Sequence, residues 1–163
     1  MNYRIEEKGG MEMFGRVTEI GNIGEQPFEQ IPDFWMQCIG DGTVDRIRAA
    51  AGLPANGQIH AVLYHKQEDR MSYLIGYMPP PGGAPEEFDR LSVPPRTYAI
   101  FSTGTYPDGQ SDIHSLWKRI WSEWFPTSDY ESLNEPEFEM TYDREDGLYE
   151  MEIWIPVRRR IAD

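Results

Sequence analysis

Cysteine is almost absent from this sequence, because Cys38 is the only one among 163 residues. A single cysteine excludes an internal disulfide and any zinc site built mainly from cysteines. Cys38 lies in a segment with apolar residues at helical spacing, so we expect a buried, unreactive thiol. The three histidines, His60, His65 and His114, do not have the spacing of metal ligands. We therefore expect no metal site and no cofactor.

Basic residues are also scarce, with 15 Lys and Arg against 28 Asp and Glu and a formal net charge of −13. Nucleic-acid binding needs clustered Lys and Arg, so this balance argues against direct DNA binding. The short run Arg158–Arg160 is terminal and is outweighed by acidic residues elsewhere. An acidic surface attracts cations weakly, although it can also serve solubility alone.

The sequence lacks a long apolar run and an N-terminal segment of charged and then apolar residues. We therefore expect no membrane span, no membrane partner and a cytoplasmic location. Phosphate-binding loops, dinucleotide fingerprints and nucleophile elbows are missing as well. No catalytic residue is predicted from such a motif.

Aromatic residues, by contrast, are plentiful, with five Trp, nine Tyr and seven Phe in a chain that is 39% hydrophobic. This composition indicates a folded domain, and the length fits one domain spanning residues 1–163. The segment from about residue 79 to residue 87 is rich in Pro and Gly, and we expect it to link two halves of the domain. The halves would cover about 1–78 and 88–158.

The two halves show a similar order of strand and helix patterns. In the first, we expect a pair of strands over 2–20 around Gly9–Gly10, helices from Phe28 to Cys38 and from Thr43 to Ala51, and strands Ile59–His65 and Met71–Met78. In the second, we expect strands Phe88–Val93 and Arg96–Thr103, a helix from Ile113 to Phe125, and strands Glu137–Asp143 and Leu148–Arg158. Such a repeat predicts an α+β fold whose antiparallel sheet carries the helices on one face, with a ligand cleft between the halves.

The last strand has an unusual combination of side chains. Alternation places Glu150, Glu152 and Trp154 on one face, opposite a face of Met, Ile and Val residues. A carboxylate among aromatic rings is suited to a lipophilic cation. Alternation alone does not choose between Glu150 and Glu152, and either carboxylate could face solvent.

Five stretches of the sequence resemble the GyrI-like small-molecule-binding domain, which is also the effector-binding domain of AraC-type and MerR-type multidrug regulators. These stretches are Ile31-Pro32-Asp33-Phe34-Trp35, Tyr73-Leu74-Ile75-Gly76, residues 93–101 (VPPRTYAIF), residues 116–121 (LWKRIW) with 124–130 (WFPTSDY), and Glu152-Ile153-Trp154-Ile155-Pro156-Val157. Each motif is modest alone, but together they follow the family order over nearly the whole chain.

The resemblance implies a duplicated strand–helix–strand–strand fold with pseudo-twofold symmetry. It also implies that Glu152 neutralises a cationic ligand in the cleft between the halves. The regulators carry a separate helix-turn-helix module, for which this chain has no room, so DNA binding is not carried over.

Aromatic residues of these motifs are the further candidates for ligand binding. Trp154 shares the face of Glu152, although ordinary sheet packing would explain it equally well. Of Tyr98 and Phe101, which fall on opposite faces, we select Tyr98. The other candidates are Trp35, Tyr73, Tyr77 and Trp121, for which core packing is the alternative.

Three functions are compatible with these observations. The protein binds an amphipathic, cationic aromatic molecule as a sensor or sequestering protein, linked to transcription regulation or drug response. Alternatively, it hydrolyses a strained or reactive molecule with Glu152 as a general base. Its acidic surface also leaves open an inhibitory module that acts on a protein partner, such as gyrase or a separate regulator. The oligomeric state is not indicated.

Overall fold

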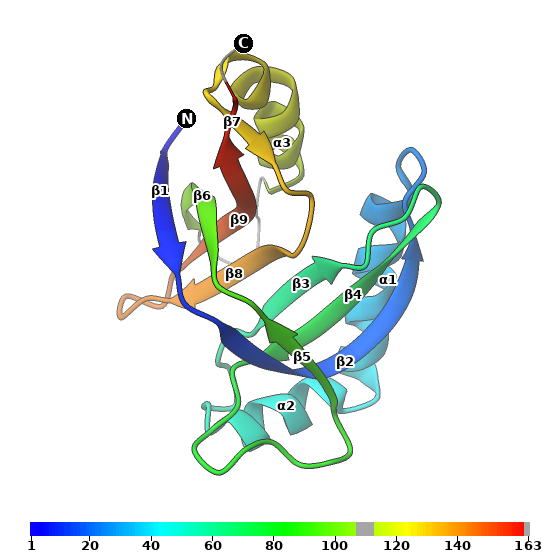
Figure 1. Ribbon diagram of the computed structural model, residues 1–163. Coiled ribbons are helices and arrows are strands. Elements are labelled where there is room, and N and C mark those ends of the chain that lie inside the picture. Colours follow the sequence, from blue (N-terminus) through cyan, green and yellow to red (C-terminus); the bar gives the residue numbers. More distant parts are fainter. Residues whose placement is uncertain (107–112, 162–163) are drawn as a thin grey trace.

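Groups of strands are separated by two helical segments in the computed structural model, which describes residues 1–106 and 113–161 (Figure 1). The strands are β1 (Tyr3–Lys8), β2 (Met11–Gly21), β3 (His60–Tyr64), β4 (Arg70–Tyr77), β5 (Asp89–Val93), β6 (Arg96–Tyr106), β7 (Tyr130–Ser132), β8 (Glu137–Asp143) and β9 (Tyr149–Arg159). The helices are α1 (Gln26–Gly40), α2 (Thr43–Ala51) and α3 (Ile113–Arg119), the last followed by a π-helical turn η1 (Ile120–Trp124) and a 3-10 turn η2 (Phe125–Thr127). All the predicted elements are present, and β7 is the strand that the sequence patterns missed.

The strands form one antiparallel sheet in the order β1-β6-β9-β8-β3-β4-β2-β5, with β7 pairing to β9 beside this path. The order is symmetrical about the contact between β8 and β3. On one side β8, β9 and β6 follow each other, and on the other side β3, β4 and β2 do the same. The predicted duplicated α+β fold is therefore observed.

The two outer strands are exchanged between the halves. β1 directly precedes β2 in the chain, yet it pairs with β6, where Tyr3 lies opposite Phe101. β5 directly precedes β6, yet it pairs with β2, where Val93 lies opposite Met11. The Gly9–Gly10 segment therefore connects strands that are not neighbours. Each half completes the sheet of the other.

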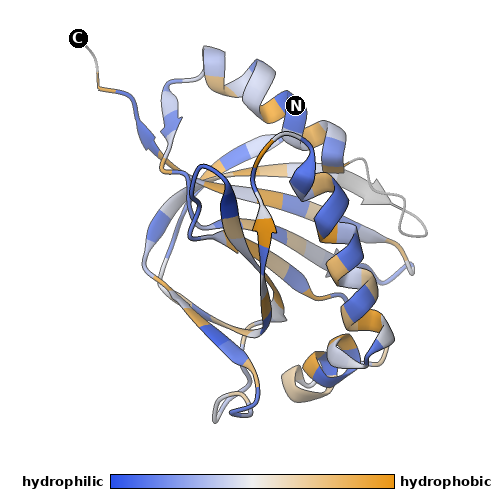
Figure 2. Cartoon of the chain, turned by 90° about the vertical axis from the view of Figure 1, so that its right-hand side faces the viewer, coloured by the Kyte–Doolittle hydropathy of each residue, from blue (hydrophilic) through white to orange (hydrophobic). Residues whose placement is uncertain are grey.

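Both faces of the sheet are apolar, and the helices cover one of them. Figure 2 shows the helical segments along one side of the sheet. On this helix face, α1 and α2 pack on β3 and β4, and α3 with its following turns packs on β6 and β9. The other face holds a third cluster, with Val62, Leu74, Tyr98, Phe138 and Trp154 among its members. The curved sheet in Figure 1 wraps around this third cluster.

A pair of glycines allows close contact between β2 and β4. Gly15 and Gly76 lie opposite each other in the antiparallel register. A Cβ atom on Gly15 would collide with the carbonyl oxygen of Ile75, and one on Gly76 with that of Phe14. Both positions therefore require glycine for the close approach of the two backbones.

The helix predicted from Ile113 to Phe125 changes its winding after Arg119, where α3 gives way to the π-helical turn η1. Ser122 Oγ donates a hydrogen bond to the carbonyl oxygen of Lys118 at 2.8 Å, a contact that often bends helices. Ile120 and Trp124 are buried on the sheet, while Trp121 remains 44% exposed. No helix in the described ranges has the length and apolar character needed to cross a bilayer.

Candidate functional site

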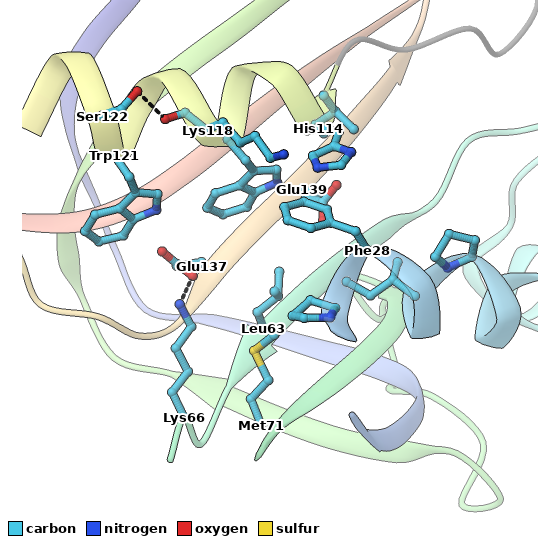
Figure 3. A pocket seen from close by; sticks show the side chains of 15 residues that line it. Phe28, Leu63, Lys66, Met71, His114, Lys118, Trp121, Ser122, Glu137 and Glu139 are labelled. Atoms are coloured by element: carbon cyan, nitrogen blue, oxygen red, sulfur yellow. Dashed lines mark hydrogen bonds and ion pairs between the residues drawn. The ribbon is translucent and has the colours of Figure 1, made fainter. Parts of the chain in front are cut away.

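A cavity of about 890 Å³ lies on the helix face of the sheet, between α1 and α3 (Figure 3). Its apolar walls include Phe28, Ile31, Leu63, Met71, Trp117 and Trp121. Its polar side chains are Lys66, His114, Lys118, Ser122, Glu137 and Glu139. Residues from both halves contribute, and the volume is typical of a site for a drug-sized molecule.

Glu139 of β8 supplies a carboxylate to this cavity. It pairs with Ala61 of β3 and Ile153 of β9, so strand alternation directs it toward the helices. The side chain lies deep among protein atoms, but it is only half-buried because the cavity reaches it. Burial raises the pKa of Glu139 to about 7, helped by the negative charge of Glu137 and opposed by a hydrogen bond from Trp117.

Glu137, two residues earlier on the same strand, faces the same cavity but has a cationic partner. The Lys66 ammonium, from the connection between β3 and β4, pairs with Glu137 Oε1. Figure 3 shows this pair below Trp121. Burial raises the pKa of Glu137, and the charge of Lys66 opposes that rise.

Aromatic and charged contacts join α1 to α3 at the rim of the cavity. The rings of Phe28 and His114 stack with their centroids 3.6 Å apart. Lys118 Nζ lies 5.8 Å from the Phe28 ring centroid and 3.6 Å from Glu25 Oε1. These contacts connect the start of α1 with α3 across the cavity. The ion pair between Lys118 and Glu25 is exposed to water and therefore contributes little stability.

Glu152, the carboxylate selected from the sequence, lies on the opposite face of the sheet. It pairs with Met140, one position beyond Glu139, so alternation turns it away from the cavity. Its Oε2 accepts a hydrogen bond from Arg4 Nη1 at 2.7 Å, and its Oε1 accepts one from Trp154 Nε1 at 3.0 Å. The chain itself thus supplies a cation for Glu152, and the carboxylates that line the cavity are those of Glu137 and Glu139.

Trp154 and Tyr98 also lie away from the cavity. Both are buried in the cluster around which the sheet wraps, and their ring centroids are 5.6 Å apart. Lys8 Nζ lies 4.9 Å from the Trp154 ring centroid, so this indole already makes a cation–π contact with a side chain of the protein. The Tyr98 hydroxyl has no hydrogen-bond partner among the described residues, and burial raises its pKa to about 12. Phe101 takes the opposite face, as the alternation predicted.

Trp35 and Tyr73 meet on the cavity side of the sheet. Trp35 Nε1 donates a hydrogen bond to Tyr73 Oη at 2.8 Å, within the cluster that includes the cavity residues Leu63 and Met71. Burial, together with the charge of Glu139, raises the pKa of Tyr73 well above its usual value. Both aromatics therefore support the cavity wall without lining the cavity itself.

Tyr77 and Trp121 complete the set predicted from the sequence. Tyr77 stacks on His60 with a centroid separation of 4.9 Å and is not part of the cavity wall. Trp121 does line the cavity and stacks on Phe125. Trp121 is thus the predicted residue whose position in the cavity supports a ligand contact.

Sequence reasoning did not single out Glu137, Glu139, Trp117 or Lys66. The signal that could have found the two glutamates is their spacing in β8, which places both opposite the apolar face of Phe138 and Met140. A face of this kind is normally solvent-exposed, so the strand pattern alone does not reveal that two helices cover it.

In the described part of the chain, no group of three or more His, Cys, Asp and Glu side chains could hold a metal ion. Cys38 is buried, and burial raises the pKa of its thiol. The thiol therefore belongs to the core beneath α1 rather than to a reactive site.

Comparison with known proteins supports an effector-binding fold. Residues 4–157 match the model of the Cass2 family, described as integron-associated effector binding protein. No curated protein sequence matches the chain. The family match covers nearly the whole chain and confirms the resemblance to effector-binding domains found in the sequence.

Three solved structures are similar in fold. SAV2435 bound to tetraphenylphosphonium has 18% identity and a TM-score of 0.76, with 97% of this chain and 94% of that chain covered. A putative transcription regulation protein from Staphylococcus aureus MU50 has 20% identity and a TM-score of 0.70, with 97% and 99% covered. An integron cassette protein from the mobile metagenome of Vibrio cholerae has 20% identity and a TM-score of 0.63, with 96% and 95% covered.

Proposed function

Because the chain belongs to the Cass2 family of integron-associated effector-binding proteins, we propose that it binds amphipathic, aromatic cations in the cavity between α1 and α3. Glu139 provides the counter-charge, and Phe28, Trp117 and Trp121 provide aromatic walls. The protein acts as a sensor or as a sequestering protein in transcription regulation or drug response.

The observation that carries this proposal is the state of Glu139. Its carboxylate is accessible from an apolar cavity and, among the described residues, Lys66 is paired with Glu137 rather than with Glu139. An anionic group in such surroundings gains much from a cation, because Coulomb attraction is strong where water is excluded. The aromatic walls add attraction between ring faces and positive charge. The binding of tetraphenylphosphonium to SAV2435, which shares the fold, supports this ligand class.

Binding of methyltriphenylphosphonium, followed by titration calorimetry and by thermal shift, tests the proposal. We expect this cation to bind and to raise the melting temperature, and neutral triphenylphosphine oxide to bind more weakly. Glu139→Gln keeps the side-chain size but removes the charge, so the cation should lose at least about tenfold in affinity, on the order of 1.4 kcal/mol.

Glu152→Gln is the matched control, because Glu152 lies on the other face of the sheet. It should leave the affinity for the cation unchanged. Equal affinities for the cation and the neutral oxide in the wild-type protein would contradict the proposal, as would a larger loss from Glu152→Gln than from Glu139→Gln.

A hydrolytic activity is the second candidate, and one observation favours it. The pKa of Glu139, raised to about 7, suits a general base that activates water near neutral pH. Consumption of a strained electrophile such as an epoxide, at protein concentrations far below that of the substrate, would show turnover. The same activity should disappear in Glu139→Gln.

A further inference from the structure

We propose that the cavity selects singly charged cations that also carry an uncharged hydrogen-bond donor, and that Lys66 determines this selectivity. Glu139 would neutralise the ligand charge, and Glu137 would accept a hydrogen bond from a second group on the ligand. This inference rests on the proposed function and specifies its ligand class.

The two carboxylates of the cavity have different partners although they share one face of β8. Successive residues in a strand are about 3.4 Å apart, which places Glu137 and Glu139 roughly 7 Å from each other along the strand. The charge of Glu137 is balanced by Lys66, whose side chain is 13% exposed against 1% for Glu137. The carboxylate of Glu139 therefore remains as the negative charge available to a ligand.

Lys66 is held in place at two points. Its backbone N–H donates a hydrogen bond to Glu135 Oε2 at 2.5 Å, and its ammonium pairs with Glu137. The ammonium is therefore a fixed positive charge at this end of the cavity. A second positive charge on a ligand would meet this ammonium instead of an open carboxylate, and would be repelled.

Glu137 Oε2 is the second part of the argument. Lys66 uses Oε1, whereas Oε2 is buried and has no hydrogen-bond partner among the described residues. A buried acceptor without a partner costs stability. Because Glu137 belongs to the cavity wall, a ligand N–H or O–H that reaches Oε2 through a small shift of the side chain would be favoured. Because Lys66 already balances the charge, an uncharged donor is sufficient.

The other charged side chains of the cavity wall do not change the charge balance set by Lys66, Glu137 and Glu139. Lys118 and His114 lie at the rim, where both approach Glu25, at 3.6 and 3.7 Å respectively. Their side chains are about half exposed, at 57% and 48%, so water screens them more than it screens Lys66.

Ethidium and propidium provide the charge test, because they share one phenanthridinium ring and propidium carries an additional quaternary ammonium. We expect the wild-type protein to bind ethidium at least as tightly as propidium, measured by fluorescence titration. Lys66→Met removes the fixed charge while keeping an unbranched side chain only one atom shorter, and should raise the affinity ratio of propidium to ethidium about tenfold or more. Lys66→Arg retains the charge and should keep the wild-type ratio.

The double variant Lys66→Met with Glu137→Met tests the hydrogen bond while leaving the net charge of the cavity unchanged. Pararosaniline and crystal violet are both singly charged triarylmethyl cations, but only pararosaniline carries N–H donors. We expect the wild-type protein to prefer pararosaniline over crystal violet, and the double variant to lose that preference while it still binds ethidium.

The outcomes separate this inference from the proposed function. If ethidium binds through Glu139 but Lys66→Met leaves the propidium-to-ethidium ratio unchanged, the role of Lys66 is refuted and the proposed function stands. If the wild-type protein fails to prefer pararosaniline, the hydrogen-bond role of Glu137 is refuted. If none of the dyes binds to the wild-type protein, the proposed function fails and this inference fails with it.

Discussion

Glu139 and Glu152 have the same side chain on neighbouring strands, but their surroundings are opposite. Arg4 and the Trp154 indole satisfy both oxygens of Glu152. Glu139 instead has a second carboxylate nearby and a single indole N–H from Trp117 that favours its charge. A carboxylate that is already neutralised offers little to a ligand, whereas one that the fold leaves uncompensated gains from a cation.

Cation binding should depend on pH because of Glu139. Its pKa of about 7 means that the carboxyl is mostly neutral below that pH and mostly charged above it. Affinity for methyltriphenylphosphonium should therefore rise by up to about tenfold per pH unit below pH 7 and level off above it. Titrations between pH 5.5 and 8.5 measure this. In Glu139→Gln the profile should be flat, and an equally steep profile there would assign the pH dependence to another group.

For single residues, the sequence predicts which side chains share a face of a strand, but not which face the helices cover. Strand alternation has only two outcomes, so it correctly separated Tyr98 from Phe101. It could not say which face of the last strand the helices cover, and Glu152 was selected on that open choice. Trp121 belongs to a helix motif, so its place at the cavity does not depend on strand register, and its contact with a ligand stays a prediction.

The helical segment from α3 through η2 places its two neighbouring tryptophans in different environments. Trp121 is 44% exposed at the cavity, while Trp124 is 8% exposed and packs edge-on against Phe101. The π-helical turn η1 contains both residues, and of the two only Trp121 lines the cavity.

Alanine substitution should separate these two roles. Trp121→Ala should weaken aromatic cation binding by about tenfold with little loss of stability, because an exposed ring contributes little to the core. Trp124→Ala should cost about 3–5 kcal/mol of unfolding free energy, because it removes a buried ring. Urea denaturation and dye titration on both variants measure the two effects. The opposite pattern would show that Trp121 is a structural residue.

The positions of the helices and of the strands other than β7 followed from the sequence because each has a clear period. The amphipathic pattern from Ile113 to Phe125 predicted the helical segment correctly. The change of winding at Ile120 was not predictable, since the apolar spacing of the segment fits a continuous α-helix. Local hydrogen bonds such as that of Ser122 become visible only in the structure.

Over the whole molecule, the exchanged strands make the two halves dependent on each other. Half one without β5 leaves the edge of β2 open, and its β1 has no β6 to pair with. The sequence indicated the duplicated order but not this exchange, because a glycine pair such as Gly9–Gly10 fits a hairpin as well as a connection between distant strands.

A cut in the Pro- and Gly-rich connection should therefore leave the molecule intact. Cleavage at an inserted protease site near Gly82, an exposed glycine in a turn, should give two fragments that remain together in size-exclusion chromatography. Residues 1–78 produced alone should show no cooperative unfolding in urea. If that fragment instead folds with the unfolding free energy of an independent domain, mutual dependence of the halves is contradicted.

The position of β1 also has a consequence for synthesis of the chain. Tyr3–Lys8 leave the ribosome before their partner residues 96–101, which follow more than 80 residues later. At translation rates of about 5–20 residues per second, β1 remains without its partner strand for several seconds. The alternating charges of Arg4, Glu6 and Lys8 keep this waiting segment hydrated and discourage pairing with other nascent chains. The same three side chains later form an ion-pair chain on the finished sheet, so they serve the protein before and after it folds.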